Sequence, residues 1–363
     1  MAVDKKPATA SPKPAPFEHA PVKPVITAPV PLLRRFTYAI RLWGLKFILW
    51  LLIRFIRLRH RIWSSLGPNL TKTYHLIRPT LEHRIYWPPS FNPKSGVKLP
   101  LFISAHGGGF ALGEPALDDH LCRGFADKHG LLVVNIDYRK SPLHPFPTAI
   151  HDVAALIRAI LEDTSLPVDH SRVVIGGYSA GANLMMSAVQ FPDIRARVHG
   201  LLAVFPATDL AGNYRGPFRP TKDGRRDLLE RTMPLFSWAY LPIGMDRTST
   251  LVSPIYASRE DFPKHMFFMG AECDLLVQET EVMAKRLAGF AKDAPTGTKW
   301  QKNGIRWKLF WDMQHGFTHL RYTGYLEEER AAAVKEFFDV AGEWMHKDVF
   351  GSQNQTKAIE GGL

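Results

Sequence analysis

The fold is decided by residues 172–184, which read RVVIGGYSAGANL. β-branched residues typical of a strand come first, a helical pattern comes last, and the motif Gly177-x-Ser179-x-Gly181 lies between them. Small neighbours permit the strained backbone that holds a serine hydroxyl out at a strand-to-helix turn, where the helix points its first N–H groups at any negative charge. Such a motif also occurs by chance, but its place between a strand and a helix favours a nucleophilic serine.

A second motif ends an apolar strand at residues 99–110, which read LPLFISAHGGGF. Its three successive glycines, Gly107 to Gly109, let the backbone pass close to a reacting atom with N–H groups pointing at it, as an oxyanion hole requires. Taken alone, the segment is equally typical of a flexible turn. Two such motifs, each directly after a strand, are much more specific than either one alone.

Strand and helix patterns alternate from about residue 80 onward. The apolar runs predict strands at 81–87, 99–105, 131–137, 200–206, 264–270 and 305–311. Helical periodicity predicts helices at 118–129, 147–162, 277–290 and 327–346. Continuous apolar strands that alternate with helices indicate an α/β fold, with a mostly parallel sheet and helices on both faces.

These motifs resemble the hormone-sensitive-lipase branch of the α/β-hydrolases, which includes arylacetamide deacetylase and many microbial carboxylesterases. The resemblance covers about residues 80–345 and extends to DYRKSPLHPFP at 137–147 and to a late His-Gly-Phe. It implies the α/β-hydrolase fold with a helical cap or lid. It also implies a lipase-like serine carboxylesterase that needs no metal or cofactor. The chain departs from the family at Tyr178, Ala182 and Cys273, which weakens any transfer of a particular substrate.

Three residues follow expected strands in the order serine, aspartate, histidine, which is the order of α/β-hydrolase triads. Ser179 is the expected nucleophile, His315 the general base and Asp274 the group that orients and stabilises the imidazole. Glu272 is an alternative to Asp274, and His319 is an alternative to His315. We favour His315 because it directly follows a strand and precedes a glycine.

The resemblance also implies an oxyanion hole and a pocket under a lid. The N–H groups of Gly107, Gly108 and Ala180 are the expected oxyanion donors. Residues 210–250 interrupt the strand–helix alternation with a bulky apolar group that would make a poor surface loop, so a lid is favoured there. We expect the substrate pocket and lid to include Phe110, Tyr178, Phe236 and Trp238.

The basic character of the chain is confined to its N-terminal arm. The net charge is +12, but residues 1–61 hold twelve Lys/Arg and two Asp/Glu and so supply +10 of it. The rest is nearly neutral, which argues against a nucleic-acid-binding protein. We expect a disordered Pro-rich tail at 1–32, a basic apolar helix at 33–62, a catalytic domain at 63–348 and a C-terminal tail at 349–363.

The apolar helix is expected to touch a membrane surface through residues 36–58. Its longest uncharged run is the seven residues from Phe47 to Ile53, whereas a spanning helix needs about twenty apolar residues. Spanning would bury Arg41 and Lys46 at a cost of about 2.5–3.5 kcal/mol each. An interfacial helix avoids that cost. A spanning anchor and a cap packed on the catalytic domain remain alternatives.

The predicted function is hydrolysis of hydrophobic esters with short or medium acyl groups through an acyl-enzyme. An acyltransferase or amidase that uses the same groups is one alternative, and a non-catalytic protein that binds small molecules is another. Two cysteines, Cys122 and Cys273, make no disulfide framework and fit a reducing compartment. We expect an intracellular protein, and the apolar helix at 36–58 adds the alternative of association with the cytosolic face of a membrane or with the endoplasmic reticulum.

Overall fold

The computed structural model describes residues 23–63, 66–291, 294, 297–322 and 325–351. Within these residues the strands form one nine-stranded sheet with the order β1-β2-β4-β3-β5-β6-β7-β9-β8. The strands are β1 (Leu70–Lys72), β2 (His83–Tyr86), β3 (Leu99–Ala105), β4 (Leu132–Ile136), β5 (Val168–Tyr178), β6 (Gly200–Val204), β7 (His265–Ala271), β8 (Lys299–Lys302) and β9 (Ile305–Phe310).

The centre of the sheet is parallel and its edges are antiparallel. Strands β4, β3, β5, β6, β7 and β9 pair in parallel, whereas β1, β2 and β8 add antiparallel pairs at the two edges. The central strands are buried on both faces because their residues are almost all apolar. The predicted α/β-hydrolase fold with a mostly parallel sheet is therefore confirmed.

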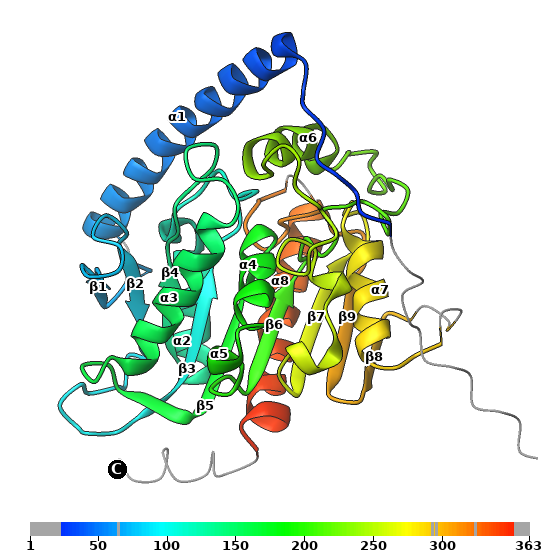
Figure 1. Cartoon of the computed structure of the whole chain (residues 1–363). Helices are drawn as coiled ribbons and strands as arrows, with labels where there is room; N and C mark the ends of the chain where they lie inside the picture. Colours follow the sequence, from blue (N-terminus) through cyan, green and yellow to red (C-terminus); the bar gives the residue numbers. More distant parts are fainter. Residues whose placement is uncertain (1–22, 64–65, 292–293, 295–296, 323–324, 352–363) are drawn as a thin grey trace, which may run out of the picture.

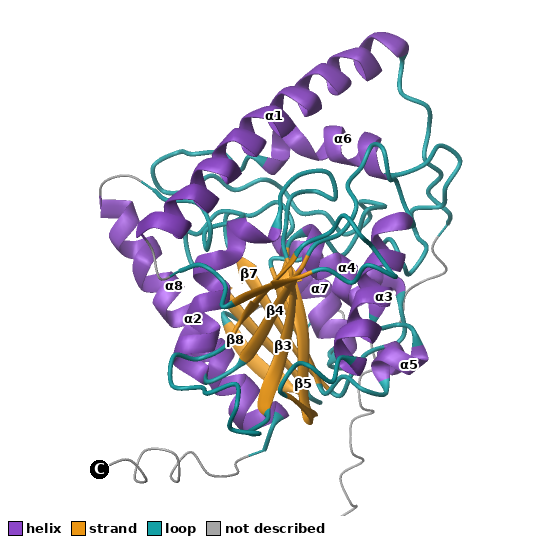
Figure 2. Ribbon diagram, turned by 90° about the vertical axis from the view of Figure 1, so that its left-hand side faces the viewer, coloured by secondary structure: helices purple, strands orange, loops and turns teal. Residues whose placement is uncertain are grey.

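Helices cover both faces of this sheet (Figures 1 and 2). One face packs against α2 (Asp119–His129) and α8 (Tyr325–Trp344). The other face packs against α3 (Thr148–Glu162), α4 (Ala180–Ala188), α5 (Pro192–Arg195) and α7 (Val277–Leu287). Short turns of 3₁₀ helix occur at η1 (Pro115–Asp118), η2 (Pro254–Tyr256) and η3 (Arg259–Asp261), and a π-turn η4 (Met345–Val349) follows α8.

Two further helices lie above the carboxyl ends of the parallel strands. Figures 1 and 2 show α1 (Leu32–Trp63) along the outer edge of the molecule, with α6 (Leu229–Tyr240) beneath it. The helices meet where Leu42 of α1 packs against Leu235 and Ala239 of α6. Helix α6 belongs to the insertion that was predicted at 210–250. Among the described residues, no helix has both the length and the apolarity needed to cross a bilayer.

The chain before α1 differs in part from the expected disordered tail. Residues 1–22 lie outside the described residues, but residues 25–27 pair with the segment at 244–247. Ile26 pairs with Asp246 in an antiparallel bridge, and the N–H of Thr27 donates to the carbonyl oxygen of Met245 at 2.8 Å. Side chains also take part, since Nε of Arg247 donates to Oγ1 of Thr27 and the N–H of Val25 donates to Oδ1 of Asp246, both at 3.2 Å, and composition alone gives no sign of these contacts.

Candidate active site

Three side chains meet at the carboxyl edge of the parallel sheet. Ser179 follows β5, Asp274 follows β7 and His315 follows β9, so the parallel strands bring together residues that are up to 136 positions apart. Nε2 of His315 lies 2.8 Å from Oγ of Ser179, and Nδ1 of His315 lies 2.8 Å from Oδ2 of Asp274. The structure thus links serine, imidazole and carboxylate in one continuous chain of hydrogen bonds.

The backbone at Ser179 is strained, as the nucleophile motif predicts. Its φ is +53°, an unusual value for a residue that is not glycine, and it stands at the N-cap of α4. The two motif glycines pack closely against the end of β3. A Cβ at Gly177 would lie 2.6 Å from the carbonyl oxygen of Ala105, and a Cβ at Gly181 would overlap the same oxygen. The short turn therefore requires glycine at both positions.

The electrostatics of the three groups favour a histidine that can take a proton. Burial lowers the pKa of His315, but the charge of Asp274 and its hydrogen bond outweigh burial and hold this pKa above its ordinary value. Asp274 is itself fixed, because Oδ1 accepts the N–H of Leu276 at 2.8 Å. The imidazole is thus oriented with one nitrogen toward the carboxylate and the other toward the serine hydroxyl.

The glycine loop lies beside the serine. A Cβ at Gly107 would lie 3.1 Å from the carbonyl oxygen of Tyr178 and 3.4 Å from the Cβ of Ser179, so the backbone of Gly107 runs directly beside the serine. Gly108 adopts a φ of +120°, and its carbonyl oxygen accepts the N–H of Leu112 at 2.8 Å. Ala180 follows Ser179 as the first residue of α4. Gly107 and Ala180 therefore lie beside the serine, and Gly108 follows Gly107 in the same loop.

His106 holds the start of the glycine loop. Its Nδ1 lies 2.6 Å from the carbonyl oxygen of Gly107, and its Nε2 lies 3.1 Å from Oδ1 of Asp137. The imidazole also stacks on the ring of Tyr138, with the ring centres 4.6 Å apart. Because both nitrogens are engaged away from Ser179, His106 acts on the loop rather than on the hydroxyl.

A small cavity of about 50 Å³ adjoins Ser179. The ring of Phe236 in α6 covers Gly109 so closely that a Cβ on this glycine would overlap the ring. Phe110 forms another wall, since its ring stacks on Tyr240 with the centres 3.9 Å apart. Ten further residues line the cavity: Ala180, Ala207, Asp209, Leu210, Arg215, Leu229, Met233, Ser237, Leu276 and Glu279.

Two residues expected in the pocket lie elsewhere. Tyr178 is buried under the sheet on the α2 and α8 side, where its ring meets His319 edge-on at 4.8 Å. Tyr178 is the last residue of β5 and lies on the same sheet face as Val174, whereas Val173 and Ile175 lie on the other face, so the alternation of the strand sets the direction of Tyr178. Trp238 packs against Tyr38 of α1 at 5.8 Å and lines an outer groove, not the cavity at Ser179.

The rival acid and base have separate partners. Oε2 of Glu272 accepts the N–H of Asp312 at 3.0 Å. Nε2 of His319 lies 3.0 Å from Oδ1 of Asp118, on the α2 side of the sheet. The structure therefore brings Asp274 and His315, and not these alternatives, to Ser179.

Two buried carboxyl groups near the site were missed from the sequence. Oδ2 of Asp227 accepts the N–H of Leu275 at 2.9 Å, and burial, followed by the charge of Asp274, raises the pKa of Asp227. Glu279 of α7 accepts the N–H groups of Thr208 and Asp209, and burial, followed by the charge of Asp209, raises the pKa of Glu279 to about 8. No local motif marks either residue, because only tertiary packing brings them to the site.

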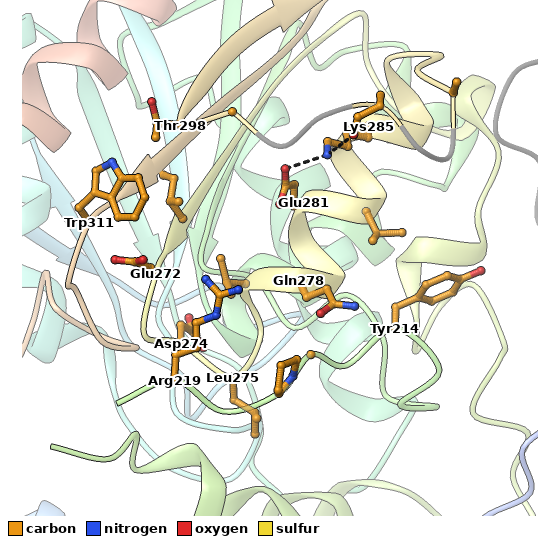
Figure 3. A pocket seen from close by; sticks show the side chains of 18 residues that line it. Tyr214, Arg219, Glu272, Asp274, Leu275, Gln278, Glu281, Lys285, Thr298 and Trp311 are labelled. Atoms are coloured by element: carbon orange, nitrogen blue, oxygen red, sulfur yellow. Dashed lines mark hydrogen bonds and ion pairs between the residues drawn. The ribbon is translucent and has the colours of Figure 1, made fainter. Parts of the chain in front are cut away.

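A larger hollow of about 730 Å³ lies behind the acid. Figure 3 shows Asp274, Arg219 and Trp311 around it, with the ion pair of Glu281 and Lys285 on α7 at 3.0 Å. Neither Ser179 nor His315 is among the residues that line it. The candidate site is therefore assigned to the smaller cavity, by geometry and not by size.

Comparisons with known proteins agree with the fold. A family model described as α/β-hydrolase fold matches residues 102–305. The chain is 37% identical over 102 residues to the esterase LipI of Mycobacterium tuberculosis, a match that covers 28% of this chain and 31% of LipI. It is 33% identical over 220 residues to the carboxylic ester hydrolase LipN of the same organism, covering 56% of each protein. The chain thus spans about a third to a little over half of the length of these relatives.

One solved structure is an α/β-hydrolase enzyme from the metagenome of Lake Arreo, Spain. It is 26% identical to this chain, with a TM-score of 0.59, and the match covers 73% of this chain and 77% of that one. The resemblance drawn from the two motifs is therefore confirmed. Since the family model covers more than half of the residues, the chain belongs to the α/β-hydrolase family, in its hormone-sensitive-lipase-like carboxylesterase branch.

Proposed function

We propose that this protein is a serine carboxylesterase that hydrolyses hydrophobic esters with short acyl groups. The single observation that carries this proposal is the chain of two 2.8 Å hydrogen bonds from Ser179 through His315 to Asp274. A hydroxyl is a weak nucleophile until an adjacent base takes its proton, and this geometry supplies that base. The names of LipI and LipN, an esterase and a carboxylic ester hydrolase, support the same reaction class.

In the acylation step, Oγ of Ser179 attacks the ester carbonyl carbon while its proton passes to Nε2 of His315. Asp274 accepts the hydrogen bond from Nδ1 and stabilises the imidazolium that forms. The tetrahedral intermediate then collapses, and the leaving alkoxide takes the proton from Nε2. The acyl group remains on Ser179 as an ester.

The oxyanion is stabilised by the glycine loop and by the start of α4. We assign the N–H groups of Gly107, Gly108 and Ala180 as the donors to the carbonyl oxygen as it becomes negative; the closeness of Gly107 to Ser179 and the place of Ala180 at the start of α4 support this assignment. Losing one such donor typically raises the barrier by about 2.7–4 kcal/mol. In the deacylation step, water attacks the acyl carbon, His315 takes its proton, and Ser179 leaves as the restored hydroxyl.

Two neighbouring spaces of very different volume limit the size of the two parts of the substrate. The cavity at Ser179 measures about 50 Å³, room for only a few heavy atoms. A groove of about 720 Å³ lies outside it and shares three lining residues with it, Arg215, Met233 and Ser237. We assign the short acyl group to the cavity and a larger alcohol group to the groove.

The test is hydrolysis of 4-nitrophenyl esters from acetate to dodecanoate. We expect the highest kcat/KM at the short acyl lengths and a fall as the chain outgrows the cavity. Ser179→Ala should lower kcat by about 10⁶-fold. Ser171→Ala is the matched control, because Ser171 is exposed on the same strand and hydrogen-bonds to Asp169. Retention of activity in Ser179→Ala would contradict the proposal.

A further inference from the structure

Helix α1 carries a continuous apolar strip on its outer side. Figures 1 and 2 show this helix at the margin of the molecule, with the described body of the protein on one side only. The strip follows the 3–4 residue spacing of one helix face. Its seven members are 48–66% exposed, and they are Phe36, Ile40, Trp43, Phe47, Leu51, Phe55 and Leu58.

The opposite side of α1 fixes which face points outward. Leu42 and Ile53 are buried, at 0% and 3% exposure. Nζ of Lys46 donates to the carbonyl oxygen of Ser141 at 2.7 Å, and Arg57 pairs with Glu82 and Glu114 at 3.1 and 2.8 Å. These contacts hold the opposite side of α1 against the rest of the protein. The apolar strip therefore faces outward in the folded protein.

Cations border this strip, one exposed cation, Arg54, falls within it, and acids are absent from it. Residues 32–63 contain no Asp or Glu and eight Lys or Arg. Arg34, Arg41 and Arg59 are exposed, and at 100° per residue they fall within about 20° of one another along one edge of the strip. An apolar face with a basic edge is typical of a helix that lies in the interface of an anionic membrane.

We propose that this strip of α1 docks flat on an anionic lipid surface. The aromatic and aliphatic side chains would enter the boundary between headgroups and acyl chains, while the arginines on the edge contact lipid phosphates. A second copy of the chain is a poorer occupant, since pairing two α1 helices would set cations against cations with no acid on either helix. An anionic headgroup layer matches both the apolar strip and its charge.

Docking would place the outer groove next to the lipid. The groove is lined by Arg34, Arg35 and Tyr38 from the start of α1 and by Pro31 just before it, and it adjoins the cavity at Ser179. A lipophilic ester could then pass from the bilayer to the nucleophile without crossing water. This consequence rests on the proposed function, whereas the docking itself does not.

Vesicle flotation of the full chain tests the docking. We would use Ser179→Ala protein, so that no result depends on turnover, with vesicles of phosphatidylcholine alone or with about 30% phosphatidylserine. We expect the protein to float with the anionic vesicles and to bind them at least tenfold more weakly when Phe36, Phe47 and Phe55 are all changed to Ser. The matched control changes Leu76, Val97 and Leu143, which are exposed elsewhere, to Ser and should bind as before.

A second pair of variants tests the basic edge. Changing Arg34, Arg41 and Arg59 to Gln should weaken binding to anionic vesicles by about 100-fold. The same number of charges removed from exposed Lys94, Lys98 and Lys264 should have a much smaller effect. Circular dichroism of every variant checks that it is folded.

Three outcomes would overturn the docking proposal. One is no flotation of the folded protein with anionic vesicles, and another is equal loss of binding in the apolar variant and its control. The third is a stable dimer in light scattering that the three Phe→Ser changes convert to a monomer, which would assign the strip to a second copy. If the protein proves to have no esterase activity, the flotation result is unaffected. The docking proposal and the proposed function can therefore fail independently.

Discussion

The carboxyl edge of the sheet and the outer helix α1 differ in how tightly their side chains are held. At the edge, Ser179, His315 and Asp274 are each fixed by hydrogen bonds of 2.8 Å, and Asp274 is also bound to backbone N–H. On α1 only Leu42 and Ile53 are buried among the described side chains of residues 32–59. The side chains at the sheet edge are thus held in fixed positions by hydrogen bonds, whereas most described side chains of α1 are at least partly exposed to solvent.

Apolar residues have different roles in these two regions. Around the site, apolar residues are buried and serve to position polar atoms, as when the chain segments at Gly177 and Gly181 press against Ala105. On α1 they stay in contact with solvent, at a free-energy cost of roughly 25 cal/mol for each Å² left exposed. A cost of that kind is recovered when another apolar phase covers the surface.

Among changes that leave Ser179 in place, the largest expected effect comes from breaking the hydrogen-bond chain at its acid. Asp274→Asn should lower kcat by about 10⁴-fold, since the amide cannot hold the imidazole in the required tautomer. His315 acts as a base only when neutral, so activity falls as pH drops through its pKa. In the wild-type protein Asp274 holds the pKa of His315 above its ordinary value. The acid limb of the kcat/KM profile should therefore lie above the ordinary histidine pKa of about 6.5.

Removal of the Asp274 charge leaves burial as the dominant influence on His315. Burial lowers the pKa of His315, so the acid limb of any residual activity should move to lower pH in Asp274→Asn. Glu272→Gln is the control, because Glu272 bonds to the N–H of Asp312 and not to His315. An unchanged profile in Asp274→Asn would contradict the assigned triad.

The next effect contrasts the two sides of α1. Leu42→Ala should lower the free energy of unfolding by about 2–5 kcal/mol, because Leu42 is buried against Leu235 and Ala239. Phe47→Ala, on the exposed strip, should change it by less than about 0.5 kcal/mol. Urea unfolding of both variants measures the difference. Equal destabilisation would mean that the strip is covered in the isolated protein.

A smaller effect is expected on acyl-length preference. Phe236 lines the cavity at Ser179 and covers Gly109, so Phe236→Ala should enlarge the acyl space. We expect the ratio of kcat/KM for hexanoate over acetate to rise about tenfold. Trp238→Ala is the matched control, since Trp238 lies on the same helix but lines the outer groove. A shift of equal size in the control would place the acyl group in the groove.

The smallest effect concerns the buried carboxyl of the lid. Asp227 raises the pKa of His315 by its charge, so Asp227→Asn should move the acid limb of kcat/KM to lower pH, by less than Asp274→Asn does. It should also cost activity by no more than about tenfold, because one hydrogen bond to the N–H of Leu275 is weakened. pH profiles of the two variants, measured together, check the order.

Much of this fold could be predicted because its central strands carry their signal locally. The runs at 99–105 and 131–137 are continuously apolar, and the structure has β3 and β4 at Leu99–Ala105 and Leu132–Ile136. The edge strands β1 and β8 were missed. Both are three or four residues long and contain mostly polar or exposed side chains, so neither shows an apolar run.

The site was predictable only where a residue sits in a motif. Ser179 and the glycine loop have fixed spacing, and His315 and Asp274 come after strands. Asp227 has no such marker, because its relation to Leu275 arises from the path of the lid. Tyr178 shows the converse: its place beside the nucleophile suggested the pocket, yet strand alternation turns it to the other face.

The proposed hydrolysis requires an activated Ser179, and covalent labelling of that hydroxyl tests the requirement directly. Purified protein would be treated with a fluorophosphonate probe beside Ser179→Ala and the control Ser171→Ala, and adducts would be mapped by mass spectrometry. We predict one adduct on Ser179 in the wild type and in Ser171→Ala, and none in Ser179→Ala. A folded wild-type protein that takes no label at Ser179, or a Ser179→Ala protein that labels equally well, would contradict the account.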